Sequence, residues 1–188
     1  MKNIVTVKIG TKYSSNDVNK IFNLHKNYNF YCYTEDPKGL HKDIKIIEPL
    51  VIYEHAVFNK LSLFNPVHNI TNVLYLDLDI IIQHSVEPLF RKPFTIGYAH
   101  WRDISYMDYE TNRPFKRRTM LNSSVMSWSK QPLEIWEDFR DNTDQVLYWW
   151  GTAGIDPYIY KHLFEYEIYE KGLLTMEPDK NAIIMLGK

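Results

Sequence analysis

The sequence has little cysteine, no long apolar run and no excess of either charge. Its one cysteine, Cys32, excludes an internal disulfide framework and a cysteine-rich zinc site. No stretch approaches the roughly 18 consecutive apolar residues of a membrane span. With 22 Lys and Arg against 23 Asp and Glu, the net charge of -1 argues against a strongly basic nucleic-acid binder and an acidic disordered tail.

The N-terminal residues alternate as in a β-strand and lack the apolar stretch of a signal peptide, so we expect a cytoplasmic protein. Aromatic residues make up 15% of the 188 residues, which is high and argues against disorder. A chain of this length is expected to form one domain, residues 1–188, with a substantial core.

Apolar periodicity predicts strands alternating with helices in the first half of the chain. The predicted strands span residues 4–9, 29–34, 43–47, 72–82, 93–99, 120–128, 167–169 and 182–186. Predicted helices begin after Ser14, between Pro49 and Pro66 (with Val57, Leu61 and Phe64 inward), at Pro132 and at Asp156-Pro157. This order predicts an α/β fold in which a mixed, mostly parallel sheet has flanking helices and a Rossmann-like N-terminal half. Cys32 is expected to be buried and inert.

Two carboxylates, Asp77 and Asp79, interrupt the strongest strand signal. Two residues apart in one strand, both side chains would leave the same face, about 6–7 Å from each other. An unpaired buried carboxylate is costly, and hard oxygen ligands suit Mg²⁺ or Mn²⁺, so the pair predicts a metal seat. A solvated strand end, where the carboxylates cap a helix or pair with Lys and Arg, is the alternative that this spacing leaves open.

Several segments, taken in order along the chain, resemble glycosyltransferases of the GT-A fold. Residues 74–81 (Leu-Tyr-Leu-Asp-Leu-Asp-Ile-Ile) resemble the Asp-x-Asp segment of glycosyltransferase family 8, the glycogenin-like and lipopolysaccharide galactosyl- and glucosyltransferases. Residues 4–11 are similar to its first strand and nucleoside-contacting turn, and residues 59–64 to its basic helix segment. Residues 121–126 resemble its Phe-Asn-Ser-Gly-Val segment, and residues 154–156 its Gly-Asp-Gln helix start.

This resemblance implies a single-domain GT-A-like fold and a set of site residues. The implied metal ligands are Asp77 and Asp79, and the implied sugar-facing or catalytic residues are Asn122 and Asp156. The donor-binding residues would be Ile9, Gly10, Thr11, Asp36, Lys60, Asp77, Leu78 and Lys188. Simpler explanations also exist: Asp156 as a helix N-cap, Asp36 as a turn residue before proline, and Gly10 and Thr11 as an ordinary turn.

The sequence departs from the family pattern in three places. The family's C-terminal His-x-x-Gly-x-x-Lys-Pro-Trp segment is matched only by Gly187 and Lys188, so its metal-binding His has no counterpart, and His84 is a candidate substitute. Ser124 stands where the family has Gly in Asn-Ser-Gly, and Pro157 stands where it has Gln in Gly-Asp-Gln.

The resemblance implies a metal-dependent transfer of a hexose from a nucleotide sugar, UDP-glucose or UDP-galactose, with retention of configuration. Mn²⁺ or Mg²⁺ would be the cofactor, and an unknown carbohydrate or protein would be the acceptor, with neither a nucleic-acid partner nor a membrane span. Two alternatives stay open: a non-catalytic or weakly active nucleotide-sugar-binding domain of the same fold, and a haloacid-dehalogenase-type phosphatase, which also carries Asp-x-Asp after an apolar strand.

Residues 101–119 fit no period, and such a loop is usually functional or mobile. Its basic cluster could hold an anionic acceptor or the diphosphate, or could simply be solvated: Arg113, Lys116, Arg117 and Arg118. Its aromatic residues could stack on a sugar or pack on the domain: Trp101, Tyr106 and Tyr109. Trp149 and Trp150 are expected in the core or in an interface.

Overall fold

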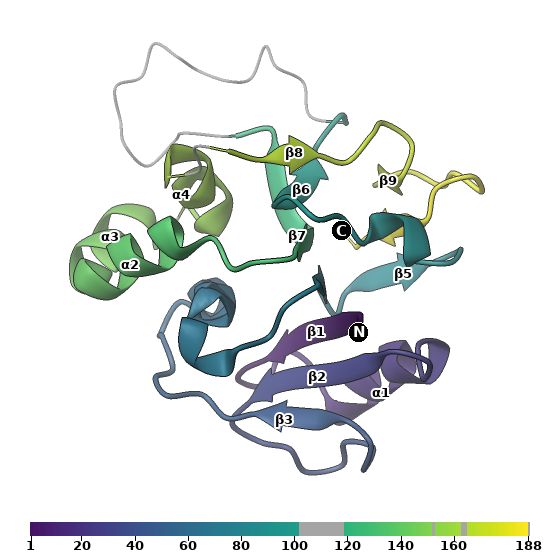
Figure 1. Ribbon diagram of the computed structural model, residues 1–188, viewed down its shortest axis with the longest axis horizontal. Helices are drawn as coiled ribbons and strands as arrows, with labels where there is room; N and C mark the ends of the chain where they lie inside the picture. The colour runs from purple at the N-terminus through teal and green to yellow at the C-terminus, as the bar shows by residue number, and fades with distance from the viewer. Residues whose placement is uncertain (102–118, 152, 163–164, 188) are drawn as a thin grey trace.

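The computed structural model describes residues 1–101, 119–151, 153–162 and 165–187 (Figure 1). The strands are β1 (Asn3–Lys8), β2 (Asn29–Thr34), β3 (Lys45–Ile47), β4 (Val73–Leu76), β5 (Ile80–Ile82), β6 (Thr95–Tyr98), β7 (Leu121–Trp128), β8 (Glu167–Ile168), β9 (Leu174–Thr175) and β10 (Ile184–Leu186). The α-helices are α1 (Ser15–Leu24), α2 (Leu133–Asp141), α3 (Thr143–Trp150) and α4 (Ile155–His162), and the 3-10 helices are η1 (Ala56–Phe64), η2 (Pro66–His68) and η3 (Glu87–Leu89).

The described strands form a large mixed sheet and a small one. The large sheet has the order β3-β2-β1-β4-β7-β6-β8, and the small one the order β5-β10-β9. β1 pairs in parallel with both β2 and β4, whereas β7 runs antiparallel to β4 and β6. The predicted fold class, a mostly parallel α/β sheet with flanking helices, is confirmed.

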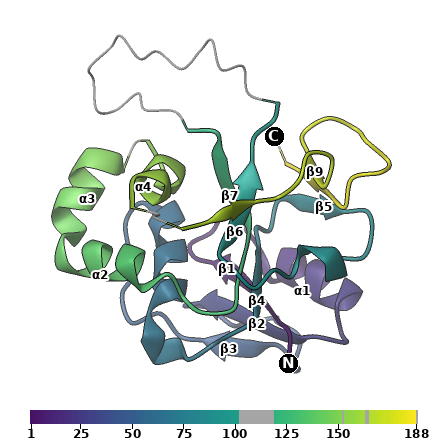
Figure 2. The ribbon, with the colours of Figure 1, turned by 45° about the horizontal axis from the view of Figure 1, so that its top comes forward.

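Strand alternation divides the core between the two faces of the large sheet. On β4, Val73 and Tyr75 point to one hydrophobic cluster while Leu74 and Leu76 point to the other. Figure 2 shows α1 on one side of the sheet and α2, α3 and α4 on the other. Because β4 is covered on both faces, its continuous apolar sequence is explained. Cys32 on β2 is fully buried, as predicted, and burial raises the pKa of its thiol to about 11.

Helix α1 begins where the sequence predicts. The Ser14 N–H donates to Asp17 Oδ2 at 2.8 Å, which satisfies a backbone group that the first helical turn leaves unpaired. Val18, Ile21 and Phe22 are buried against the sheet. This helix connects β1 to β2 as a parallel crossover and fixes the position of the loop that follows β1.

The prediction of one strand over residues 72–82 is wrong. The chain leaves the large sheet after Leu76, turns through Asp77, Leu78 and Asp79, and continues as β5 in the small sheet. A continuous central strand would have buried both carboxylates between packed layers, whereas the turn places them at the sheet edge. The two side chains therefore do not share one strand face.

Smaller differences concern the helices. The segment between Pro49 and Pro66 is the 3-10 helix η1, whose Leu61 and Phe64 are buried as expected while Val57 is 44% exposed. Helix α4 begins at Ile155, so Asp156 lies in its first turn and is not the N-cap. α3 was not predicted as a separate helix. Across the described ranges, no helix is long and apolar enough to cross a membrane.

Candidate active site

The candidate site lies where three parallel strands end. β1, β2 and β4 point the same way, and their carboxyl ends lead into residues 9–11, residues 35–36 and the Asp77–Asp79 turn. β1 has β2 on one side and β4 on the other, so the chain order reverses at β1. In open α/β sheets such a reversal leaves a crevice at the carboxyl ends of the strands, where ligands bind.

Asp77 is held by a lysine and a tyrosine. The Lys60 ammonium on η1 lies 2.8 Å from the Asp77 carboxylate, and the Tyr75 hydroxyl donates to Asp77 Oδ1. Only 12% of the Lys60 side chain and 18% of the Asp77 side chain are exposed. Burial raises the pKa of Tyr75 well above its usual value, and the neighbouring Asp77 charge adds to the effect. The structure thus brings together two residues that the sequence assigned to one site.

Asp79 meets a different pair of residues, from the loop between β1 and α1. Tyr13 donates its hydroxyl to Asp79 Oδ2 at 2.6 Å, and the Lys12 ammonium lies 3.2 Å from the same oxygen. Burial alone would raise the pKa of Asp79, but the hydrogen bonds from Tyr13 and Lys12 outweigh it and the pKa is lowered. Burial raises the pKa of Tyr13 to about 12. Lys12 and Tyr13 are not among the site residues predicted from the sequence, although their place after the first strand pointed to this edge.

The turn after β1 contacts the end of β2. Gly10 has a φ of +72°, a backbone conformation that side chains rarely adopt, and its N–H donates to Glu35 Oε1 at 2.6 Å. Ile9 is buried, whereas Gly10 and Thr11 are exposed. Asp36 Oδ1 accepts from the Lys38 N–H at 3.1 Å, which is the turn role predicted for Asp36. Its contact with the nucleotide-sugar donor stays a prediction.

Strand β7 joins the Asp77 turn to helix α4. The Ser124 carbonyl accepts from the Asp77 N–H at 2.9 Å, and the Ser123 N–H donates to Asp156 Oδ1 at 3.0 Å. Asn122 Oδ1 accepts from the Ser124 N–H at 3.1 Å, so its side chain is held against its own strand. The pairing of β6 with β7 shifts register at this point, next to Gly97. Ser123 and Ser124, which are adjacent on β7, thus link Asp156 and the backbone of Asp77 to the same short segment as Asn122.

The last described residues return to the Asp77–Asp79 turn. β10 runs antiparallel to β5 and pairs Leu186 with Ile80. A Cβ added at Gly187 would lie 2.2 Å from the Asp79 carbonyl oxygen, so only glycine fits there. Lys188, predicted to meet the diphosphate, lies outside the described residues. His84 contacts the Lys180 carbonyl instead of completing a metal site.

The donor atoms at this edge fit a divalent ion. Asp77 and Asp79 supply hard carboxylate oxygens, and each is paired with a lysine ammonium, as the strand-end alternative predicted. Mg²⁺ and Mn²⁺ commonly bind through one or two carboxylates plus substrate phosphates and water. Within the described part of the chain, no three His, Cys, Asp or Glu side chains gather as a closed metal site. Leu78 between the two carboxylates is buried and anchors the turn.

The predicted contacts of the central loop fall largely outside the described residues. This holds for Tyr106, Tyr109, Arg113, Lys116, Arg117 and Arg118. Trp101 is described and packs against the hydrophobic cluster that contains Leu74 and Leu76. Trp150 is buried as expected, whereas Trp149 is 40% exposed.

Solved structures share this fold. The galactosyltransferase LgtC, in complex with donor and acceptor sugar analogs, has a TM-score of 0.61 at 13% identity, covering 98% of this chain and 86% of LgtC. A glycosyltransferase involved in glycosylation of the major capsid of PBCV-1 has a TM-score of 0.55 at 13% identity, covering 98% and 91%. Apo GlyE of Streptococcus pneumoniae TIGR4 has a TM-score of 0.60 at 13% identity, covering 98% of this chain but 54% of GlyE.

These identities are low, so the three likenesses show the fold alone. No curated protein matches the chain in sequence. A family model does: the glycosyl transferase family 8 model matches residues 3–127, more than half of the chain and the part that contains the Asp77–Asp79 turn. The phosphatase alternative is thereby removed, and the chain belongs to glycosyl transferase family 8.

Proposed function

We propose that this family 8 protein transfers a hexose from a nucleotide sugar, a UDP-sugar in the first instance, to a carbohydrate or protein acceptor, with a divalent metal ion. The observation that carries the proposal is the pair of carboxylates at the carboxyl edge of the sheet, each held beside a lysine. At such an edge the carboxylates attract the metal ion and the lysines attract the diphosphate.

The leaving diphosphate needs positive charge, because negative charge grows on it as the bond to the sugar breaks. Asp77 and Asp79 would hold Mn²⁺ or Mg²⁺, which supplies Lewis-acid stabilisation of the phosphate oxygens. Lys60 is largely buried on η1 and therefore keeps its ammonium group within the site. Lys12 is more exposed and contributes a second positive charge from the β1–α1 loop.

The remaining predicted residues are proposed to complete the site around this centre. Ile9, Gly10 and Thr11 would present backbone to the nucleoside, with Asp36 beside them at the end of β2 and Leu78 fixing the metal-binding turn. Asn122, on the irregular part of β7, and Asp156, on α4, would orient the donor sugar or the acceptor hydroxyl. Lys188, which lies outside the described residues, keeps its predicted role as a diphosphate-binding residue.

We extend the proposal to retention of configuration. The acceptor hydroxyl would form its new bond on the face that the diphosphate leaves, while the sugar–phosphate C–O bond breaks and the hydroxyl proton passes to the leaving phosphate. This route requires no protein nucleophile. Its rate would instead depend on how well Asn122 and Asp156 orient the donor sugar and the acceptor hydroxyl.

Thermal melting with UDP or GDP, each with and without Mn²⁺, tests the donor site. A ligand at about 100 times its dissociation constant stabilises the folded state by about 2.7 kcal/mol, and each kcal/mol moves the midpoint by roughly 2–4 °C in a chain of this size. We expect a shift that needs both UDP and Mn²⁺. No shift with either nucleotide would contradict a working donor site.

Two variants locate the site. Asp79→Asn should abolish the Mn²⁺-dependent shift while leaving the melting temperature of the free protein nearly unchanged, because Asp79 is partly exposed. Lys60→Ala should weaken UDP binding more than uridine binding. Equal losses for UDP and uridine would remove Lys60 from the phosphate site.

A binding domain without catalysis is the second candidate, favoured by the lack of a three-residue metal cluster among the described residues. Hydrolysis or transfer from UDP-glucose or UDP-galactose with Mn²⁺ separates the two functions. Binding without any release of UDP would support the binding domain.

A further inference from the structure

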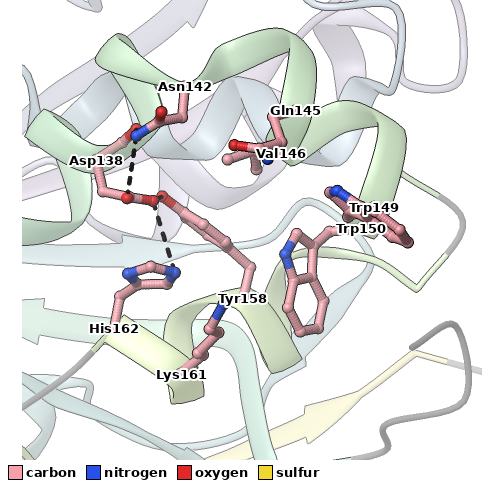
Figure 3. Close-up of a pocket in the computed structure, with 9 residues that line it drawn as sticks. All are labelled: Asp138, Asn142, Gln145, Val146, Trp149, Trp150, Tyr158, Lys161 and His162. Carbon is pink, nitrogen blue, oxygen red and sulfur yellow. Dashed lines mark hydrogen bonds and ion pairs between the residues drawn. The ribbon is translucent and has the colours of Figure 1, made fainter. Parts of the chain in front are cut away.

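A cavity opens in the helical part of the molecule. It has a volume of about 450 Å³ and lies among α2, α3 and α4 (Figure 3). This volume is within the range of small-molecule sites. Its lining residues do not include any of those that surround Asp77 and Asp79. Nothing in the proposed transfer reaction uses it.

One side of this helical cavity is aromatic. Figure 3 shows Trp149 and Trp150 together on one side, with Tyr158 projecting between them and the polar residues. Trp150 is 8% exposed and therefore rigid in the core, whereas Trp149 is 40% exposed at the rim. Flat, partly exposed indole rings supply a large contact area at a low cost in conformational entropy. They suit a ligand that has a flat apolar face.

The other side presents polar groups that are already held in place. Asp138 Oδ2 accepts from the Tyr158 hydroxyl at 2.7 Å, and Asp138 Oδ1 accepts from Asn142 Nδ2 at 3.3 Å. The His162 imidazole lies 3.5 Å from Asp138 Oδ2. Gln145 adds an exposed amide at the rim. The amides both donate and accept, as a ligand with several hydroxyl groups requires.

The charges of the cavity nearly balance. Asp138 contributes a negative charge and Lys161 a positive one, and the Lys161 ammonium lies 5.7 Å from the centre of the Trp150 ring. The cation position over that ring is therefore already filled by the protein's own side chain. A strongly charged ligand gains little here, whereas a neutral one with hydroxyl groups and an apolar face fits both walls.

We propose that this cavity binds a neutral hexopyranose unit of an oligosaccharide, stacked on Trp149 and hydrogen-bonded by Asn142, Gln145 and Asp138. The inference goes beyond the proposed transfer reaction, because it assigns sugar binding to helices α2, α3 and α4 and needs neither nucleotide nor metal. A glycan held there would be anchored at a point outside the donor edge.

Saturation-transfer NMR on the intact chain, without nucleotide or metal, tests this site. The probes are maltopentaose, lactose, glucose and galactose, used at concentrations that detect dissociation constants of about 1 mM. We expect transfer to the ring C–H protons of at least one probe. Absence of transfer to all four would overturn the proposal.

Matched variants test whether the sugar binds in the helical cavity. Trp149→Ala and Gln145→Ala change exposed or partly exposed residues, and loss of the Trp149 ring should weaken binding roughly tenfold. Tyr160→Ala is the control, because Tyr160 is a 57% exposed aromatic residue of α4 outside the cavity lining. Undiminished binding in both Trp149→Ala and Gln145→Ala would overturn the assignment, as would an equal loss in Tyr160→Ala.

The donor-site variant keeps the two hypotheses separate. Asp79→Asn should remove the melting shift with UDP and Mn²⁺ and leave the sugar signals unchanged. Trp149→Ala should weaken the sugar signals and leave the melting shift unchanged. Loss of sugar binding in Asp79→Asn would place the sugar at the donor edge and overturn the proposal. Loss of the nucleotide shift alone would leave sugar binding at the cavity intact.

Discussion

Asp77 at the sheet edge and Asp138 in the helical cavity have similar partners but differ in the basic group beside them. Each carboxylate accepts from a tyrosine hydroxyl, Tyr75 in one case and Tyr158 in the other. At the edge the basic group is the Lys60 ammonium, 2.8 Å from the carboxylate. In the cavity it is the His162 imidazole at 3.5 Å, and burial lowers the pKa of His162, which favours its neutral form.

The two carboxylate sites therefore suit different ligands. A lysine–carboxylate pair at the sheet edge places both signs of charge where an anionic ligand and its metal ion would bind. A carboxylate beside an imidazole can sit in a nearly neutral cavity, where hydrogen bonding and stacking decide the affinity. The comparison predicts that the two regions respond differently to mutation, salt and pH.

The largest contrast should appear in folding stability. Asp77→Ala leaves the largely buried Lys60 and the fully buried Tyr75 without their partner, so we expect a loss of about 2–3 kcal/mol in the free energy of unfolding. Asp138→Ala should cost about 1 kcal/mol, because its side chain is more exposed and the Tyr158 hydroxyl keeps a second acceptor, the Ile135 carbonyl. Urea unfolding measures both variants.

Asp79→Ala is the control for that experiment. Its side chain is 41% exposed, and a surface ion pair contributes about 1 kcal/mol or less. An equal or larger loss in Asp138→Ala than in Asp77→Ala would show that the two regions do not differ in the way described.

The second contrast should appear in the salt dependence of binding. Raising NaCl from about 0.05 M to about 0.5 M shortens the screening length, so UDP binding at the lysine-lined edge should weaken several-fold. Binding of a neutral oligosaccharide in the cavity should change less than about twofold over the same range. Titration calorimetry or NMR titration at the two salt concentrations compares them. A parallel loss for both ligands would break the comparison.

The smallest contrast should appear in the pH dependence of stability. Burial lowers the pKa of His162 below its usual 6.5, although the neighbouring Asp138 charge opposes this. The unfolded chain therefore takes up the proton first, and the stability that neutral His162 provides is complete above pH 6.5 and declines as the pH falls below it. Asp79, with a pKa below 3.8, loses its contribution only as the pH falls below that value.

Unfolding free energies at pH 7 and pH 5 test this order. His162→Gln should lose less stability than the wild-type protein between these two values, and Asp79→Asn should lose as much as the wild type. His25 and His68 also have pKa values lowered by burial, so a residual slope should remain in every variant. If His162→Gln lost as much unfolding free energy between pH 7 and pH 5 as the wild type, a role for His162 in the pH dependence of stability would be contradicted.

Much of the sheet could be predicted from local sequence. The strand over residues 29–34 and the start of α1 after Ser14 were predicted where the structure has them, because strand alternation and the Ser14–Asp17 capping pair are local signals. The break after Leu76 could not be predicted, since Ile80, Ile81 and Ile82 continue the apolar pattern. Their departure into a second sheet depends on β10, which lies about a hundred residues further along the chain.

The candidate site likewise contains residues that the sequence predicted and residues that it did not. The Asp-x-Asp pattern and Lys60 were found from the sequence, because motif spacing and residue type are written in the chain. Lys12 and Tyr13 were not found, since their contact with Asp79 joins residues 66 and 67 positions apart. The cavity lined by Trp149, Asp138 and His162 was likewise missed, because α3 was not predicted as a helix of its own.

The sequence by itself determined the alternating elements, the family motif and the chemistry of the two carboxylates. Periodicity, capping and residue type act over a few neighbouring residues, so they can be read locally. Only the tertiary structure decided which cation each carboxylate meets, that the strand breaks between Leu76 and Ile80, and that a neutral aromatic cavity forms among the helices. Each of these depends on packing between distant segments, where the cost of burying an unpaired charge selects among the arrangements that the local pattern allows.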